Sequence, residues 1–126
     1  MTETDLEQMK IWIKALRSGE YSQTKTTLED CDGYCCLGVA VKVLVDDPVM
    51  RIDGTLFGEF PEHQRNAPAW LIHANNDFQS KAGFYLANLN DMHNFTFFEI
   101  ADLLEMVYIN GEVDKAKEIL RNRVRI

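Results

Sequence analysis

Apolar side chains recur at three- and four-residue steps near the start of the chain, which predicts an amphipathic helix. The residues on this stripe, with Trp12 beside them as an expected core anchor, are Leu6, Met9, Ile13 and Leu16. Thr4-Asp5-Leu6-Glu7 has the form of a capping box, in which a hydroxyl and a carboxylate bond backbone N–H groups at a helix start. We therefore expect the helix to begin there and to end at Gly19 with a left-handed residue.

The apolar segment that follows Tyr34 fits two periods. Cys36, Val39, Ala40, Val43 and Leu44 form a helical stripe, whereas Val39, Val41, Val43 and Val45 alternate as a strand would. We favour a buried central helix because the segment has few polar residues on any side, and because the small residues Gly38 and Ala40 permit close packing. Pro48 would end this element.

Other segments predict strands. Residues 21–28 are rich in Thr, which suits a short strand or an extended connection, and residues 30–33 have turn chemistry. In the segment 50–57, Asp53-Gly54 lies between alternating apolar residues, and this pattern is a strong signal for a β-hairpin. We expect a small antiparallel sheet here, followed by a loop over residues 60–67.

The C-terminal half combines short ambiguous segments with two clear helices. Residues 69–72 after Pro68 and residues 84–89 fit helix or strand, and Asn75-Asn76-Asp77 predicts a turn. Thr96-Phe97-Phe98-Glu99 is a second capping box. It opens a helix that Asn110-Gly111 should end. The apolar stripe of this helix consists of Phe97, Ile100, Ala101, Leu104 and Val107. Residues 113–120 suggest a final short helix. The whole pattern predicts an α+β fold, a small antiparallel sheet with several packed helices in a single domain over residues 1–126.

The chain has 126 residues and a formal charge of -7, which is unevenly distributed. Residues 43–106 carry ten acids and three bases, whereas residues 112–126 carry five bases and three acids. Because phosphate backbones are bound mainly by Lys and Arg, we expect no duplex nucleic acid as a partner. The longest apolar run, 39–45, is far shorter than the roughly 20 residues that a membrane span needs, so we expect no membrane association.

The cysteines Cys31, Cys35 and Cys36 are the most reactive side chains of the chain. Their odd number and two adjacent members argue against a disulfide framework and for a reducing cytoplasm. A thiolate at Cys35 or Cys36 would be stabilised by a helix N-terminus, and His73 or His93 would then serve as the base of a cysteine hydrolase. The alternative is that both cysteines are small buried side chains. Their spacing does not suit a zinc site, so we expect no metal and no cofactor.

A second polar cluster precedes the helix that Thr96 opens. Its amides and carboxylate offer paired donors and acceptors for a small polar ligand, and the N–H groups after Thr96 suit an anion. The alternative is a turn and capping segment whose side chains bond their own backbone. The candidate ligand-binding residues are Asn88, Asn90, Asp91, His93, Asn94 and Thr96.

Three blocks of the sequence resemble a family of small, uncharacterised tailed-phage and prophage proteins. The blocks are Ala15-Leu16-Arg17-Ser18-Gly19-Glu20-Tyr21, then Tyr34-Cys35-Cys36-Leu37-Gly38-Val39, and then Leu89-Asn90-Asp91 with Phe97, Ile100 and Ala101. The resemblance implies a phage or prophage origin and an accessory role in the infected cell, and it brings no biochemical activity with it.

Together these features predict a non-enzymatic phage accessory protein in the host cytoplasm. It would bind a host protein or a host signalling molecule and so counter host defence. Sequestration of a small anionic nucleotide-like ligand and cysteine hydrolysis are the alternatives. The acidic middle and basic end of the chain also lead us to expect a homodimer.

Overall fold

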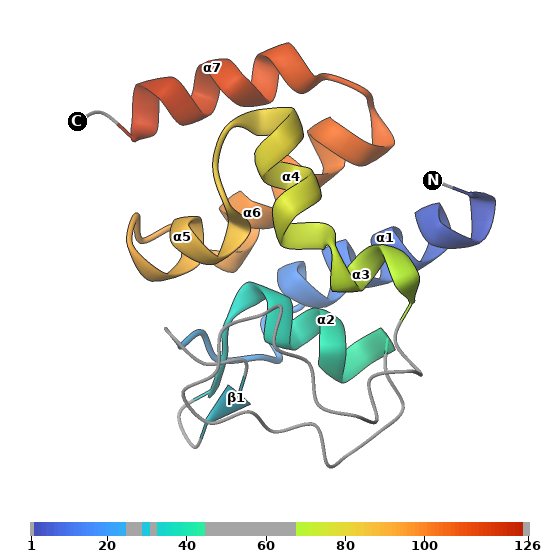
Figure 1. Cartoon of the computed structure of the whole chain (residues 1–126). Coiled ribbons are helices and arrows are strands. Elements are labelled where there is room, and N and C mark those ends of the chain that lie inside the picture. Colours follow the sequence, from blue (N-terminus) through green and yellow to red (C-terminus); the bar gives the residue numbers. More distant parts are fainter. Residues whose placement is uncertain (1, 25–28, 31–32, 45–67, 125–126) are drawn as a thin grey trace.

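The computed structural model describes residues 2–24, 29–30, 33–44 and 68–124. Most of these residues are helical (Figure 1). The helices are α1 (Glu3–Arg17), α2 (Cys36–Leu44), α3 (Ala69–Ile72), α4 (Ala74–Ala82), α5 (Leu86–Asp91), α6 (Phe97–Leu104), the π-helical turn η2 (Glu105–Ile109) and α7 (Val113–Arg123), and the strands are β1 (Glu29–Asp30) and β2 (Gly33–Tyr34).

The predicted α+β class is wrong. β1 and β2 are two residues long each and pair antiparallel. Gln23 also forms an isolated parallel β-bridge with Tyr34 of β2. No helix packs on a sheet face in the described part of the chain; the helices pack on one another instead. The predicted hairpin over residues 50–57, the stop at Pro48 and the loop 60–67 lie outside the described residues.

Helix α1 confirms the first amphipathic stripe. Met9, Trp12, Ile13 and Leu16 are buried, and Gly19 has the left-handed φ of 76° that was expected at the end of the helix. The predicted cap is wrong by two residues. The Thr2 hydroxyl accepts from the Asp5 N–H at 3.1 Å and the Asp5 carboxylate accepts from the Thr2 N–H at 3.0 Å, so the reciprocal capping box begins at Thr2.

The segment with two possible periods is helical, as we favoured. Residues Cys36 to Val41 of α2 are all buried, which explains why no polar face was visible. β-Branched valines are tolerated here because burial against α1 and α5 outweighs their modest preference for strands.

The region after Pro68 is helical as well, and this overturns the predicted turn at Asn75-Asn76-Asp77. These residues lie inside α4, where Asp77 pairs with Lys81 four residues on. The Asn75 Oδ1 accepts from the Ala87 N–H of α5 at 3.0 Å. Side chains that usually favour turns therefore form tertiary contacts from within a helix.

The second predicted helix and the final helix are confirmed. Thr96 and Glu99 form the reciprocal capping box of α6, and the apolar stripe from Phe97 to Val107 is buried. The helix continues into η2 and ends at Asn110, followed by Gly111 with a φ of 69°. Ala116 and Leu120 of α7 are buried.

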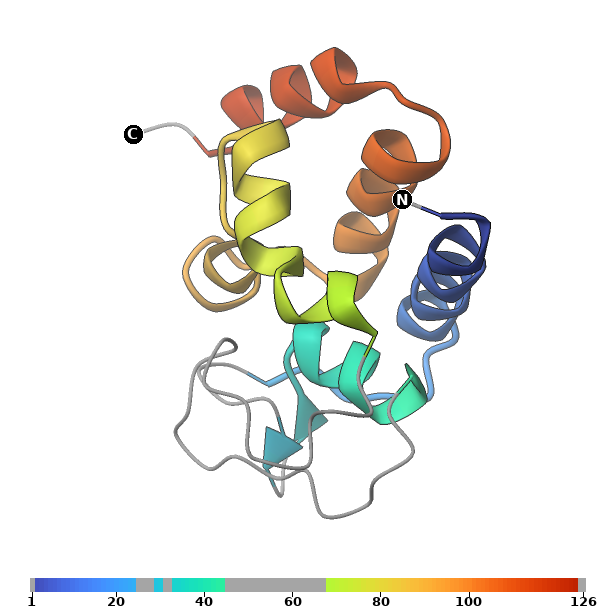
Figure 2. The ribbon, with the colours of Figure 1, turned by 45° about the vertical axis from the view of Figure 1, so that its right-hand side comes forward.

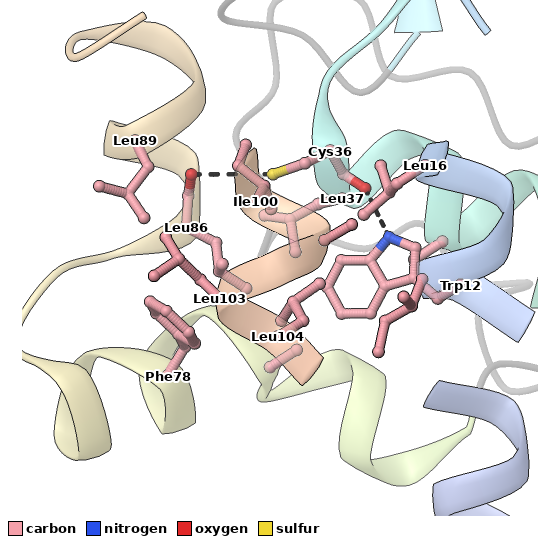
Figure 3. Close-up of a cluster of buried hydrophobic side chains, with 14 of the residues drawn as sticks. Trp12, Leu16, Cys36, Leu37, Phe78, Leu86, Leu89, Ile100, Leu103 and Leu104 are labelled. Carbon is pink, nitrogen blue, oxygen red and sulfur yellow. Dashed lines mark hydrogen bonds between the residues drawn. The ribbon is translucent and has the colours of Figure 1, made fainter. Parts of the chain in front are cut away.

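The core lies where α1, α2 and α6 meet. Helix α1 packs most extensively against α2 and α6, and α7 packs on α4 and η2 (Figure 2). Trp12 is fully buried, as expected, and its Nε1 donates to the Cys36 carbonyl at 2.9 Å, so the indole joins α1 to α2 (Figure 3). Of the helices that the structure describes, none combines the length and apolar character that a bilayer crossing requires.

Candidate functional site

Cys35 lies at the N-terminus of α2, the position that the nucleophile hypothesis required. Its Sγ accepts from the Gly38 N–H at 3.3 Å, which is the bond an N-cap side chain makes. Burial nevertheless raises the pKa of the Cys35 thiol to about 11, although the N–H groups of Gly38 and Leu37 act in the opposite direction. Desolvation of the thiolate therefore outweighs its stabilisation by the helix terminus.

Cys36 is fully buried, and its Sγ lies 3.7 Å from the Leu86 carbonyl oxygen (Figure 3). Burial raises the pKa of this thiol well above its ordinary value. His73 lies exposed between α3 and α4, and the ring of His93 meets the ring of Phe84 edge to face at 6.0 Å. Within the described residues, neither imidazole is hydrogen-bonded to a cysteine, and a catalytic role for the four candidate residues stays a prediction.

Asn90, the central residue of the predicted ligand cluster, is completely buried. Its Oδ1 accepts from the Gln23 Nε2 at 2.8 Å and from the Cys36 N–H at 3.2 Å. Its Nδ2 donates to the Thr24 carbonyl and to the Asp91 Oδ1, both at 2.8 Å. Every donor and acceptor site of this amide that matters for a ligand is already used inside the protein.

The remaining residues of the cluster have varied positions around the end of α5 and the start of α6. Asn88 is exposed, and its carbonyl accepts from the Met92 and His93 N–H groups. Asn94 adopts a left-handed φ of 57°, and Thr96 caps α6. A ligand-binding role for the cluster stays a prediction, while the contacts described for Asn88 and Thr96 are those of a turn and a cap.

A pocket of about 340 Å³ lies elsewhere, between α1, the α3–α4 corner and η2. We call it the α4 pocket. It has an aromatic and aliphatic wall with several polar side chains, and it is lined by Leu6, Trp70, His73, Ala74, Asp77, Lys81, Val107 and Tyr108.

Three polar side chains of the α4 pocket form one connected network. The Tyr108 hydroxyl donates to the Asp77 Oδ2 at 2.6 Å, and the Lys81 Nζ lies 2.9 Å from the Asp77 Oδ1. Partial burial acts to raise the pKa of Asp77, but the bonds from Tyr108 and Lys81 prevail and lower it. Burial, followed by the bond to Asp77, raises the pKa of Tyr108 far above its ordinary value. Asp77 is therefore ionised and Tyr108 neutral at physiological pH.

Trp70 in the wall of the α4 pocket makes one hydrogen bond and one ring contact. Its Nε1 donates to the Gln8 Oε1 at 2.9 Å, and its ring centroid lies 6.0 Å from that of Trp12 at an interplanar angle of 33°. Because Trp12 is fully buried, Trp70 rests against the core itself. A ligand would meet an indole whose position is set before binding.

The sequence prediction missed this pocket, with the exception of His73. The Asn75-Asn76-Asp77 pattern predicts a turn, and this prediction conceals the four-residue spacing of Asp77 and Lys81 along one face of a helix. Tyr108 lies 31 residues further along the chain, and no local pattern links it to Asp77. The Asp77–Lys81 spacing was the one signal available in the sequence.

Metal ligands do not gather in this part of the molecule. Within residues 2–24, 29–30, 33–44 and 68–124, no group of three or more His, Cys, Asp and Glu side chains is placed to hold a metal ion.

Comparison with known families gives a match to part of the chain. A family described as a domain of unknown function, DUF8296, matches residues 6–51, which include most of α1 and all of α2. The match ends before α3, so the α4 residues of the pocket lie outside it. No curated protein and no solved structure matches the chain significantly.

Proposed function

We propose that this chain is a non-enzymatic accessory protein of a tailed phage or prophage that binds a small host molecule in the host cytoplasm. The observation that carries the proposal is the α4 pocket, in which an indole, a carboxylate and an ammonium converge. Small-molecule sites usually combine apolar walls with a few placed polar groups in this way. The phage origin rests on the resemblance of the three sequence blocks.

The chemistry of the α4 pocket suits a planar, polar ligand. Trp70 offers a preorganised aromatic wall for a flat ring. Asp77 accepts hydrogen bonds and Lys81 donates them, and their formal charges cancel. We therefore expect a heterocycle with neighbouring donor and acceptor groups, such as a nucleobase, to contribute more affinity than a phosphate group would.

The ionisation states of the site support binding rather than catalysis. A general acid or base works best with a pKa near the operating pH. The pKa of Asp77 is lowered and that of Tyr108 is raised, so both pKa values lie further from neutral pH than in a free side chain. The buried, protonated thiols of Cys35 and Cys36 likewise disfavour the cysteine hydrolase.

A thermal-shift screen with free bases, nucleosides and nucleotides at millimolar concentration tests the proposal. A ligand at 100 times its Kd stabilises the folded state by about 2.7 kcal/mol, which is a readily measured rise in Tm. Binding should also change tryptophan fluorescence through Trp70, because the other tryptophan, Trp12, is shielded in the core.

Matched variants locate the site. We expect Lys81→Gln to weaken the ligand found in the screen at least fivefold by calorimetric titration, since it removes the ammonium donor. Lys117→Gln removes the same charge from α7, outside the residues that line the pocket, and should change affinity less than twofold. The proposal fails if none of the compounds shifts the Tm, or if both variants bind equally well.

A further inference from the structure

A second hollow, of about 310 Å³, lies between α1 and η2. We call it the Lys14 hollow. It combines an isoleucine floor with a mostly cationic rim, and it is lined by Lys10, Ile13, Lys14, Arg17, Glu105 and Ile109.

The three cations of the rim differ in how strongly they are engaged. Arg17 is held from both sides, because its Nη1 lies 2.9 Å from the Glu105 Oε2 and its Nη2 lies 2.6 Å from the Asp102 Oδ1. These bonds use two of its five N–H donors. Lys10 lies 3.3 Å from Glu7, and both side chains are largely exposed, so this pair is weak.

Lys14 has no acidic partner among the described residues. With Glu7, Asp102 and Glu105 counted against the three cations, the surface around the hollow is formally neutral, whereas the chain as a whole carries -7. Lys14 therefore offers an acidic group of a partner a positive charge that none of these carboxylates pairs with. Duplex nucleic acid is not a suitable occupant, because it needs an excess of cations.

We propose that the Lys14 hollow is the docking surface for a short segment of a partner protein in which acidic and apolar side chains alternate. An acidic side chain of that segment pairs with Lys14 and Lys10, and the unused N–H groups of Arg17 donate to a second carboxylate or to a carbonyl oxygen. An apolar neighbour covers Ile13 and Ile109. Charge complementarity of this kind selects the partner and raises the association rate.

Selection from a library of random 12-residue peptides displayed on a carrier, with the full chain as bait, tests this surface. We expect enriched peptides to contain Asp or Glu next to Leu, Ile or Phe. The most enriched peptide, labelled with a fluorophore, is then titrated against the wild type by fluorescence anisotropy at 50 and 500 mM NaCl. Its affinity should fall at the higher salt concentration, because the rim charges are exposed.

Paired variants decide whether the Lys14 hollow is the site. Lys14→Glu should weaken the peptide at least tenfold, whereas Arg121→Glu, an exposed charge reversal on α7, should change its affinity less than twofold. Lys14→Gln should give an intermediate loss. The proposal is wrong if no acidic and apolar peptide is enriched, if the two reversals weaken binding equally, or if a peptide of Glu alone binds as well as the selected one. None of these outcomes bears on the α4 pocket, which uses different residues.

Discussion

The buried side-chain amide of Asn90 forms hydrogen bonds with polar groups from separate segments of the chain. It accepts from Gln23 and from the Cys36 N–H, and it donates to Thr24 and Asp91. Because it bonds the first N–H of α2, it acts as a cap supplied from a distant helix. The residue that we expected to face a ligand is instead the connection between α5, α2 and the segment before β1.

Replacing Asn90 by Ala should destabilise the protein by about 2–3 kcal/mol, because the Cys36 N–H stays buried without its acceptor. The matched change Asn88→Ala, in the same helix but exposed, should fall within about 0.5 kcal/mol of the wild type. Urea unfolding followed by circular dichroism measures both. Equal stabilities of the two variants would show that the amide network contributes little.

Helix termini decide how far the elements could be predicted. The capping box of α6 lies within four consecutive residues, Thr96 to Glu99, and the sequence predicts it together with the apolar stripe that follows. The starts of α2 and α5 are bonded by Asn90 and Asn75, which lie 54 and 12 residues away along the chain. A local pattern cannot reveal such caps. This is one physical reason why residues 84–89 fit either helix or strand and why the sequence around Asn75 predicts a turn.

The cap of α1 provides a direct test at this scale, because two threonines near the helix start have different roles. Thr2→Ala should cost about 1 kcal/mol, since it removes the hydroxyl that accepts from the Asp5 N–H. Thr4→Ala changes an exposed residue inside the helix and should be neutral or slightly stabilising, because Ala has the higher helix propensity. Urea midpoints compare the two, and the reverse order would restore Thr4 as the cap.

The class of the whole molecule was predicted less well than its clearest helices. The predicted strands rest on β-branched residues and on Asp53-Gly54, and these features report only the conformational preference of a short segment. In the described residues, β-branched Val39 and Val41 are buried in a helix because α1 and α5 supply partners for that face. The α4 pocket is lined by residues up to 102 positions apart, Leu6 and Tyr108, and local patterns could not predict it for the same reason.

Because both thiols are buried, we expect the free energy of unfolding of the whole molecule to fall at alkaline pH. Cys35 ionises near its ordinary pKa of 9.0 when the chain is unfolded and at about 11 when it is folded. The stability that this thiol contributes is therefore complete below pH 9 and is lost as the pH rises towards 11, by about 1.4 kcal/mol per pH unit. Urea unfolding at a series of pH values measures this loss.

Cys35→Ser is the matched variant for this experiment. The serine hydroxyl still accepts from the Gly38 N–H but does not titrate in this range, so the decline between pH 9 and 11 should become shallower. The comparison concerns the slope and not the absolute stability, because a buried hydroxyl has its own cost. Identical slopes would mean that Cys35 is accessible to solvent in the folded state.

The π-helical turn η2 forms a partition between two compartments. Val107 and Tyr108 face the α4 pocket, while Glu105 and Ile109 face the Lys14 hollow. A substitution that enlarges one compartment by moving this turn must reshape the other, so the two surfaces are not independent targets for mutation at residues 105–109. Changes in α4 or along the outer face of α1 escape this constraint, and they are where the specificity of one compartment can diverge while the other is kept.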